Sequence, residues 1–210
     1  MIERLRKDLI INAKRIIKDY DPSHDMHHSL RVLKNAEYIQ KHEGGDLEII
    51  IPAAIFHDAV NYPKNDLRSK NSAIESAQIA EKILRNINYY NKNKIDSVKK
   101  AIIEHSYSNG IKPYIKESKI VQDADRLEAT GAIAIMRTFC STGQMKRKFY
   151  NPEDPFCRNH EPDPLNYAID LFYKRLLKVK DLMNTKTAIE LAEKRTEFLR
   201  QFIIQLEKEI

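Results

Sequence analysis

The sequence lacks the cysteines, the long apolar runs and the apolar N-terminal stretch that mark several classes of protein. Its two cysteines, Cys140 and Cys157, are too few for a disulfide scaffold and form no CxxC motif. The longest apolar run, residues 49–56, is far too short to cross a bilayer and contains a proline. The first residues lack the continuous apolar stretch of a signal peptide. We therefore expect a cytoplasmic protein without a membrane partner.

What the chain does contain is typical of a folded protein. Of its 210 residues, 42% are hydrophobic and 31% are charged, which supplies enough apolar material for a core and argues against disorder. There are 36 lysines and arginines against 30 acidic residues, so the formal net charge is +6. This excess is compatible with an anionic partner but does not say which one.

Apolar residues recur mostly at helical spacing, and the 5 glycines are few. The continuously apolar segment 47–60 would also suit a buried strand, but its neighbours are helical, so we interpret it as a buried helix. Ser23 is the expected N-cap of the second helix, and Gly44-Gly45 its end. The sequence predicts an all-α fold, with helices at about residues 2–20, 23–43, 47–60, 73–84, 95–105, 118–139, 165–182 and 187–206.

Residues 140–164 differ from the rest, with Gly143, four prolines and the basic run Lys146-Arg147-Lys148. A loop of this length in a compact domain is either functional or mobile. We interpret the basic run as solvated, with a lid that meets phosphate as the alternative.

Some ionisable residues lie on helix faces that ought to be apolar. In a continuous helix at 100° per residue, Asp125 shares a face with Val121, Ala129, Ala132 and Met136, whereas Asp123 lies about 160° away. Asp125 therefore points into the apolar face, where a carboxylate needs a cation, a metal or hydrogen-bond donors.

His57 and Asp58 end the most apolar helix, and His28 lies at the edge of its own helix's apolar side. Two imidazoles and two carboxylates make a mixed ligand set for a divalent transition metal, with positions left for water and substrate. Each residue also has a plainer interpretation, as a satisfied core histidine, a helix cap or an ion-pair partner. Only their joint occurrence favours a metal site.

Three segments, HDMHHSLRV (24–32), FHD (56–58) and DADRLEA (123–129), resemble the H…HD…D signature of the HD superfamily of helical metal-dependent phosphohydrolases. With further matches at residues 62–65, 105–108, 131–133 and 153–156, the chain is similar to the YedJ/YpgQ-like bacterial branch over nearly its whole length. We expect a single domain, 1–210. It would have an HD core at about 20–139, a loop and possible lid at 140–164, and C-terminal helices at 165–210 packed on the core.

The resemblance implies that the ligands of a divalent metal (Mn, Mg, Co, Ni, Fe or Zn) are His28, His57, Asp58 and Asp125. It agrees with the helical phase, which favours Asp125 over Asp123. Superfamily members that split guanosine tetraphosphate-type substrates carry Glu-Asp three and four residues after the HD pair. Here these positions are Asn61 and Tyr62, which disfavours that substrate and leaves a nucleoside triphosphate or related ester open.

The implied activity is hydrolysis of a phosphate ester or phosphoanhydride, with a nucleotide as the expected substrate, by attack of a metal-bound water on phosphorus. Asp58 would be both a ligand and the acceptor for that water. His105 would protonate the leaving group or bind a second metal. The substrate-binding candidates, each with a solvated surface role as its alternative, are Lys64, Arg68, Arg31, Arg126 and His24.

The alternative is a non-catalytic helical regulator that binds a nucleotide or nucleic acid through its basic surface. The sequence shows no helix-turn-helix signature or zinc-finger spacing, which argues against nucleic acid as a partner. All four ligand positions are present, which favours the enzyme. The apolar face of the last helix, which includes Leu191, Phe198 and Phe202, suits core packing or a homodimer.

Overall fold

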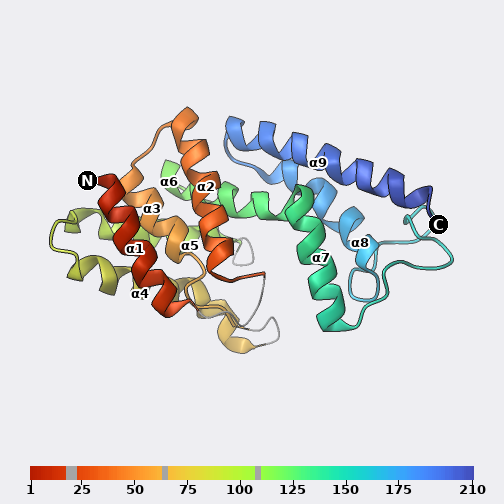
Figure 1. The fold of residues 1–210 in the computed structure, drawn as a ribbon, viewed down its shortest axis with the longest axis horizontal. Coiled ribbons are helices and arrows are strands. Elements are labelled where there is room, and N and C mark those ends of the chain that lie inside the picture. The colour runs from red at the N-terminus through yellow and green to blue at the C-terminus, as the bar shows by residue number, and fades with distance from the viewer. Residues whose placement is uncertain (18–22, 63–65, 107–109) are drawn as a thin grey trace. The chain divides into compact units, whose positions relative to one another are not determined.

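The computed structural model describes residues 1–17, 23–62, 66–106 and 110–210. Regular structure in these ranges is helical, apart from an isolated bridge between Lys148 and Tyr167, which confirms the predicted all-α class (Figure 1). The chain divides into two compact units, residues 1–125 and 126–210, which are described separately. No helix of the described ranges is long and apolar enough to span a membrane.

The first unit is built around one fully buried helix, α3 (Leu47–Phe56), which packs against four neighbours. Its residues from Ile49 to Phe56 are all buried, which explains the unbroken apolar run and confirms the helical interpretation. The surrounding elements are α1 (Ile2–Ile16), α2 (Met26–Glu43), α4 (Ser72–Asn86), α5 (Ile95–His105) and α6 (Lys116–Arg126), with 3₁₀ turns η1 (Leu67–Asn71) and η2 (Lys92–Lys94).

Pro52 lies inside α3 and has no N–H to donate to the carbonyl of Glu48, four residues earlier. The hydroxyl of Tyr90 donates to that carbonyl instead, at 2.9 Å. Tyr90 is buried, so a side chain from outside the helix satisfies the acceptor that the proline leaves open.

We expect Tyr90→Phe to lower the free energy of unfolding by about 1 kcal/mol, because the partly buried Glu48 carbonyl would lose its donor while the ring stays in place. Urea unfolding followed by circular dichroism measures this change. Tyr38→Phe, at an exposed position on α2, is the control and should stay within about 0.5 kcal/mol of the wild type. Equal effects of the two substitutions would contradict the role given to Tyr90.

The helix boundaries correct several sequence predictions. The N-cap of α2 is Asp25, not Ser23, and its carboxylate accepts a hydrogen bond from the amide of His28 at 2.7 Å. Gly44, with φ of 77°, ends α2 as predicted. Helix α1 ends at Ile16, with Ile17 extended, and not at the predicted residue 20; Asp21-Pro22 itself lies outside the described residues. Helix α3 ends at Phe56 rather than Val60.

The prediction of one helix over 118–139 is wrong. The chain leaves the α-helix after Arg126, passes through the 3₁₀ turn η4 (Leu127–Ala129), and restarts as α7 (Gly131–Met145). Gly131 has φ of +66°, a conformation that L side chains rarely adopt, and a Cβ there would lie 3.2 Å from Cβ of Arg195. The break changes the helical phase, so Ala132 and Met136 are exposed and do not share a face with Asp125.

The second unit contains η4, α7, α8 (Ala168–Lys174), η5 (Leu176–Leu182) and α9 (Lys186–Glu207). Arg175 divides the predicted helix 165–182 into α8 and η5. Helix α7 extends six residues beyond the predicted end at Phe139, so the long loop begins at Lys146. The unit has its own buried core, formed by Ala134, Ile169, Phe172, Leu176, Leu199 and Ile203.

The basic run 146–148 is not wholly solvated. Arg147 donates to the carbonyl of Pro164 at 2.7 Å and to the hydroxyl of Ser141, and burial lowers the pKa of its guanidinium. Arg147 therefore joins the two ends of the loop.

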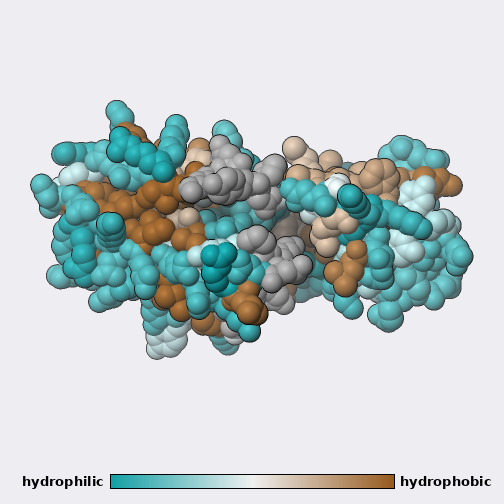
Figure 2. All heavy atoms as spheres, turned by 90° about the horizontal axis from the view of Figure 1, so that it is seen from below, coloured by the Kyte–Doolittle hydropathy of each residue, from teal (hydrophilic) through white to brown (hydrophobic). Residues whose placement is uncertain are grey.

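Apolar side chains also gather on the surface of the first unit (Figure 2). Between α1 and α4 they line a groove of about 390 Å³ that includes Ile16, Ile79, Ile83 and Ile87.

Candidate metal centre

Four side chains meet inside the first unit, and together we call them the His/Asp cluster: His28, His57, Asp58 and Asp125. The Nε2 atoms of His28 and His57 lie 3.0 Å apart. Asp58 Oδ2 lies 3.4 Å from His57 Nε2, and Asp125 Oδ1 lies 3.5 Å from His28 Nε2. Both imidazoles are fully buried, whereas the carboxylates are 25% and 30% exposed. One side of the cluster is therefore open to solvent.

These separations fit ligands of one divalent ion. With metal–ligand bonds of about 2.1 Å, neighbouring ligand atoms lie about 3.0 Å apart in octahedral and about 3.4 Å apart in tetrahedral geometry. The nitrogen–nitrogen distance matches the first value, and the four nitrogen–oxygen distances, 3.4, 3.5, 3.7 and 3.8 Å, lie at or slightly above the second. Two imidazoles and two carboxylates also form a donor set that suits a transition ion.

Backbone carbonyls fix the orientation of two histidines. The Nδ1–H of His57 donates to the carbonyl of Ala54 at 2.9 Å, and that of His105 donates to the carbonyl of Ile102 at 2.5 Å. In both cases the acceptor lies three residues earlier at the end of a helix. Nδ1 is thus occupied, and Nε2 faces the cluster, the arrangement that metal-binding histidines commonly adopt.

The cluster collects residues from three segments of the chain. His28 lies in the first turn of α2, held by the Asp25 cap, and Asp125 lies in the last turn of α6. The amide of Asn35 donates to the carbonyl of Ala124 at 3.2 Å and so ties α2 to α6 beside Asp125. The HD pair directly follows α3.

The charges of the histidines and the carboxylates in the cluster shift one another's pKa. Burial by itself would lower the pKa of His57, but the charges of Asp58 and Asp125 outweigh it and raise that pKa to about 9. Burial likewise opposes ionisation of the carboxyls, but the charge of His57 holds the pKa of Asp58 well below its usual range. His57 and His28 together lower the pKa of Asp125. The carboxylates are therefore kept ionised, as metal ligands must be.

Two further histidines adjoin the cluster. His105, the last residue of α5, is buried, and its Nε2 lies 3.5 Å from Asp58 Oδ1, the oxygen opposite the one that faces His57. The His24 ring packs edge-on against that of His28, with centroids 5.6 Å apart. Both therefore lie close to the predicted ligands, and the roles that the sequence analysis gave them stay predictions.

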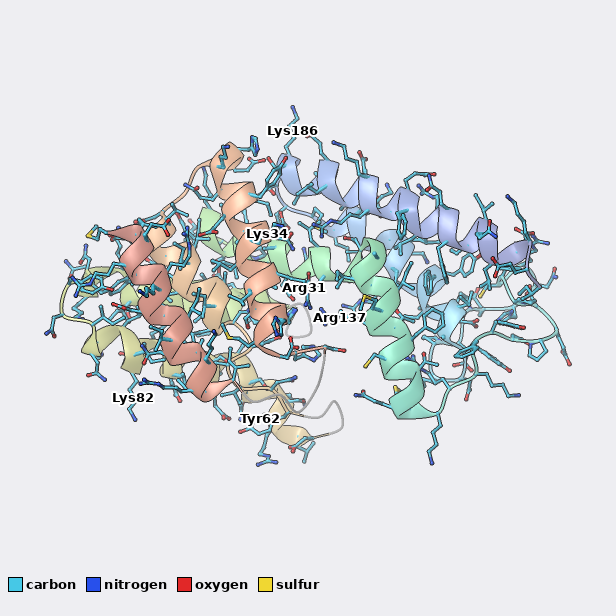
Figure 3. All side chains as sticks on the ribbon, viewed as in Figure 1. Arg31, Lys34, Tyr62, Lys82, Arg137 and Lys186 are labelled. Atoms are coloured by element: carbon cyan, nitrogen blue, oxygen red, sulfur yellow. The ribbon has the colours of Figure 1, made fainter. Side chains whose placement is uncertain are left out.

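The basic residues that the sequence analysis assigned to substrate binding have different surroundings. Arg31 projects from α2 one turn beyond His28 (Figure 3). Arg68 is exposed, pairs with Asp66 at 2.7 Å and lies over the ring of Tyr62. Arg126 donates to the carbonyl of Leu182 within the second unit. Lys64 lies outside the described residues.

Sequence reasoning did not find three supporting groups: the Asp25 cap and the carbonyls of Ala54 and Ile102. A sequence signal exists for the first, because an aspartate three residues before His28 has the spacing of an N-cap to its third helical residue. Backbone carbonyls leave no such signal. Nor did sequence reasoning predict the complete burial of Asp123.

Comparisons with known proteins identify the family of the chain. Residues 26–130 match the HD domain family. The YpgQ protein of Bacillus subtilis (strain 168) is 35% identical over 203 residues, covering 94% of this chain and 90% of that protein. The chain therefore belongs to the HD-domain family, as the H…HD…D resemblance predicted.

Solved structures show the same relationship. Bacillus subtilis YpgQ in complex with ADP matches with a TM-score of 0.74 at 31% identity, covering 100% of this chain and 97% of that one. An HD-superfamily hydrolase from Bacillus thuringiensis gives a TM-score of 0.74 at 32% identity, with 100% and 98% covered. The family and these neighbours support a hydrolase.

Proposed function

We propose that this protein is a metal-dependent phosphohydrolase that cleaves a phosphate ester or phosphoanhydride bond of a nucleotide. The convergence of the His/Asp cluster carries the proposal, because two imidazole nitrogens 3.0 Å apart with two ionised carboxylates beside them are arranged as ligands. A divalent ion, when bound, lowers the pKa of water from about 16 towards about 7 and offsets negative charge on a phosphoryl oxygen.

The protein's own residues would position the reactants and move protons. His28, His57 and Asp125 would hold the ion, and Asp58 would supply one oxygen as a ligand. Its second oxygen, Oδ1, which lies 3.5 Å from His105 Nε2, would accept a hydrogen bond from the attacking water. His105 would donate a proton from Nε2 to the oxygen that leaves phosphorus, since its Nδ1 is bonded to the carbonyl of Ile102.

Several observations favour a nucleotide over other phosphate compounds. The related YpgQ binds ADP in its solved structure. His24 and Arg31 lie on either side of His28 in the sequence, and we assign them to the substrate phosphate. Arg68, Arg126 and Lys64 stay predictions, and the bonds of Arg68 and Arg126 within the protein favour a structural role for those two.

The residues after the HD pair argue against a guanosine tetraphosphate-type substrate. The hydroxyl of Tyr62 donates to Glu75 at 2.8 Å, and this hydrogen bond, with a smaller contribution from burial, raises the pKa of the phenol. Tyr62 therefore does not replace the missing acidic proton donor.

A nucleotide panel tests the proposed function. Purified protein is first treated with a chelator and then supplied with Mn²⁺, Mg²⁺ or Co²⁺, and orthophosphate and pyrophosphate are measured separately for each nucleoside mono-, di- and triphosphate. We expect hydrolysis that is lost after chelation and restored by at least one of the ions. For a triphosphate, orthophosphate as the product indicates cleavage of the terminal phosphate, and pyrophosphate indicates cleavage between the α- and β-phosphates.

Nucleotide binding without hydrolysis under any of the three ions would contradict the proposal. It would support the alternative, a non-catalytic regulator.

A further inference from the structure

A second group of metal-binding residue types lies in the other unit, away from the residues assigned so far. Cys157, His160 and Asp170 each place one ligand atom within 4.8 Å of the other two, and we call them the Cys157 cluster. Cys157 and His160 come from the loop before α8, and Asp170 comes from α8 itself. Asp170 is fully buried, and the other two are half-buried.

The imidazole of His160 is held in a fixed orientation. Its Nδ1 lies 2.8 Å from Asp154 Oδ2, and its Nε2 lies 2.9 Å from Asp170 Oδ2. Asp154 is itself fixed by hydrogen bonds from the backbone amides of Arg158 and Asn159. At metal sites, a histidine commonly binds the ion through one ring nitrogen and donates a hydrogen bond from the other to a carboxylate.

The two carboxylate oxygens of Asp170 have unequal surroundings. Oδ2 faces His160 and also accepts a hydrogen bond from the amide of Asp163 at 2.8 Å. Oδ1 is fully buried and receives no hydrogen bond of good geometry from the described residues. Leaving a buried carboxylate oxygen without a partner costs free energy, and a coordinated cation would remove this cost.

A cysteine nucleophile activated by His160 does not fit this arrangement. Both ring nitrogens of His160 make their hydrogen bonds to carboxylates, and neither bonds Sγ of Cys157, so the hydrogen bond that joins a nucleophile to its base is not formed.

We propose that Cys157, His160 and Asp170 bind a divalent cation of the Zn²⁺ class. Sulfur, imidazole nitrogen and carboxylate oxygen are the three ligand types that Zn²⁺ takes in proteins, and a tetrahedral ion would keep its fourth position for water. Asp170 binds through Oδ1, and Oδ2 keeps the amide of Asp163. Bound in this way, the ion fastens the loop that carries Cys157 and His160 to the start of α8. This site is independent of the His/Asp cluster and of its proposed function.

Cobalt provides the test, because a thiolate bound to Co²⁺ produces a near-ultraviolet charge-transfer band that nitrogen and oxygen ligands do not. The His/Asp cluster contains no cysteine, so Co²⁺ bound there does not contribute to this band. We titrate Co²⁺ into metal-free, reduced full-length protein. Because the His/Asp cluster also takes up Co²⁺, the band should reach its plateau by about two equivalents of added ion per chain, and it should disappear when Zn²⁺ is added.

The two cysteines provide a matched pair of variants. Cys157→Ser should abolish the band, whereas Cys140→Ser should leave it unchanged, and Asp170→Asn should weaken Co²⁺ binding by at least about tenfold. Absence of the band from the folded wild-type protein would overturn the proposal. So would a band that survives Cys157→Ser or vanishes in Cys140→Ser.

A measurement on the wild-type protein covers the case in which Cys157→Ser does not fold. Alkylation of each cysteine is followed by mass spectrometry with and without Zn²⁺. We expect Zn²⁺ to slow alkylation of Cys157 by at least about tenfold and to leave Cys140 unaffected. Equal rates with and without Zn²⁺ at Cys157 would overturn the proposal.

Discussion

Replacing His28 by alanine is expected to lower kcat/KM for the nucleotide identified by the panel by at least about 10³-fold. The ion at the His/Asp cluster is proposed to stabilise the transition state by several kcal/mol, and each 1.4 kcal/mol corresponds to about a factor of ten. His28 is fully buried with Nε2 facing His57, so its loss removes one ligand and leaves a cavity. Steady-state kinetics at saturating Mn²⁺ measure the effect.

His27 gives a closely matched control for this variant. It is the preceding residue, has the same side chain and lies exposed on α2. His27→Ala should keep kcat/KM within about twofold of the wild-type value. Circular dichroism of both variants shows whether the fold is retained. If folded His28→Ala hydrolysed the nucleotide as fast as His27→Ala, His28 would not be a ligand.

Phe172→Ala is expected to lower the free energy of unfolding by about 3–5 kcal/mol. Phe172 is fully buried in the core of the second unit and stacks on Phe202, with ring centroids 5.6 Å apart and planes inclined by 18°. A third ring, that of Phe139, lies 6.4 Å away. Truncation would remove all of these contacts and leave a cavity that the short helix α8 cannot close. Urea unfolding gives the change directly.

The control for this prediction is Phe198→Ala on α9. Phe198 is 48% exposed and lies outside the buried core of the unit, so its loss should change the free energy of unfolding by no more than about 0.5 kcal/mol. Similar changes for Phe172→Ala and Phe198→Ala would show that the Phe172 core does not stabilise the second unit.

Much of the fold follows from local patterns in the sequence. The apolar periodicity of α5 and α9 predicts these helices almost to the residue, because one face of each is buried. The break at Gly131 is different. It depends on a positive φ and on the close approach of Arg195, more than sixty residues later, and periodicity does not report either. The N-cap of α2 could not be predicted either. Aspartate and serine are both good N-caps, so the sequence does not distinguish Asp25 from Ser23, and the backbone conformation determines which of them caps the helix.

Part of the candidate site could be predicted from the sequence, because burying an ionisable side chain on an apolar helix face costs free energy unless the side chain has a partner. That argument and the H…HD…D resemblance single out the same four residues, and the structure brings them together. The helical phase used for Asp125 holds for Val121, which precedes it and is buried, and fails for Ala132 and Met136, which lie beyond the break. The Cys157 cluster escaped prediction because Asp170 lies thirteen residues from Cys157 on a different element, with no recognisable metal-binding spacing.

The most direct measurement is the position of a bound ion. Crystals grown with Mn²⁺ and measured at the manganese absorption edge locate the ion by its anomalous scattering. Mn²⁺ is suited to this purpose because it prefers imidazole and carboxylate ligands over thiolates. We predict an anomalous peak within about 2.3 Å of Nε2 of His28 and His57 and of one oxygen each of Asp58 and Asp125. In crystals of a protein that hydrolyses nucleotides with Mn²⁺, a peak elsewhere and none at this cluster would contradict the proposed metal centre.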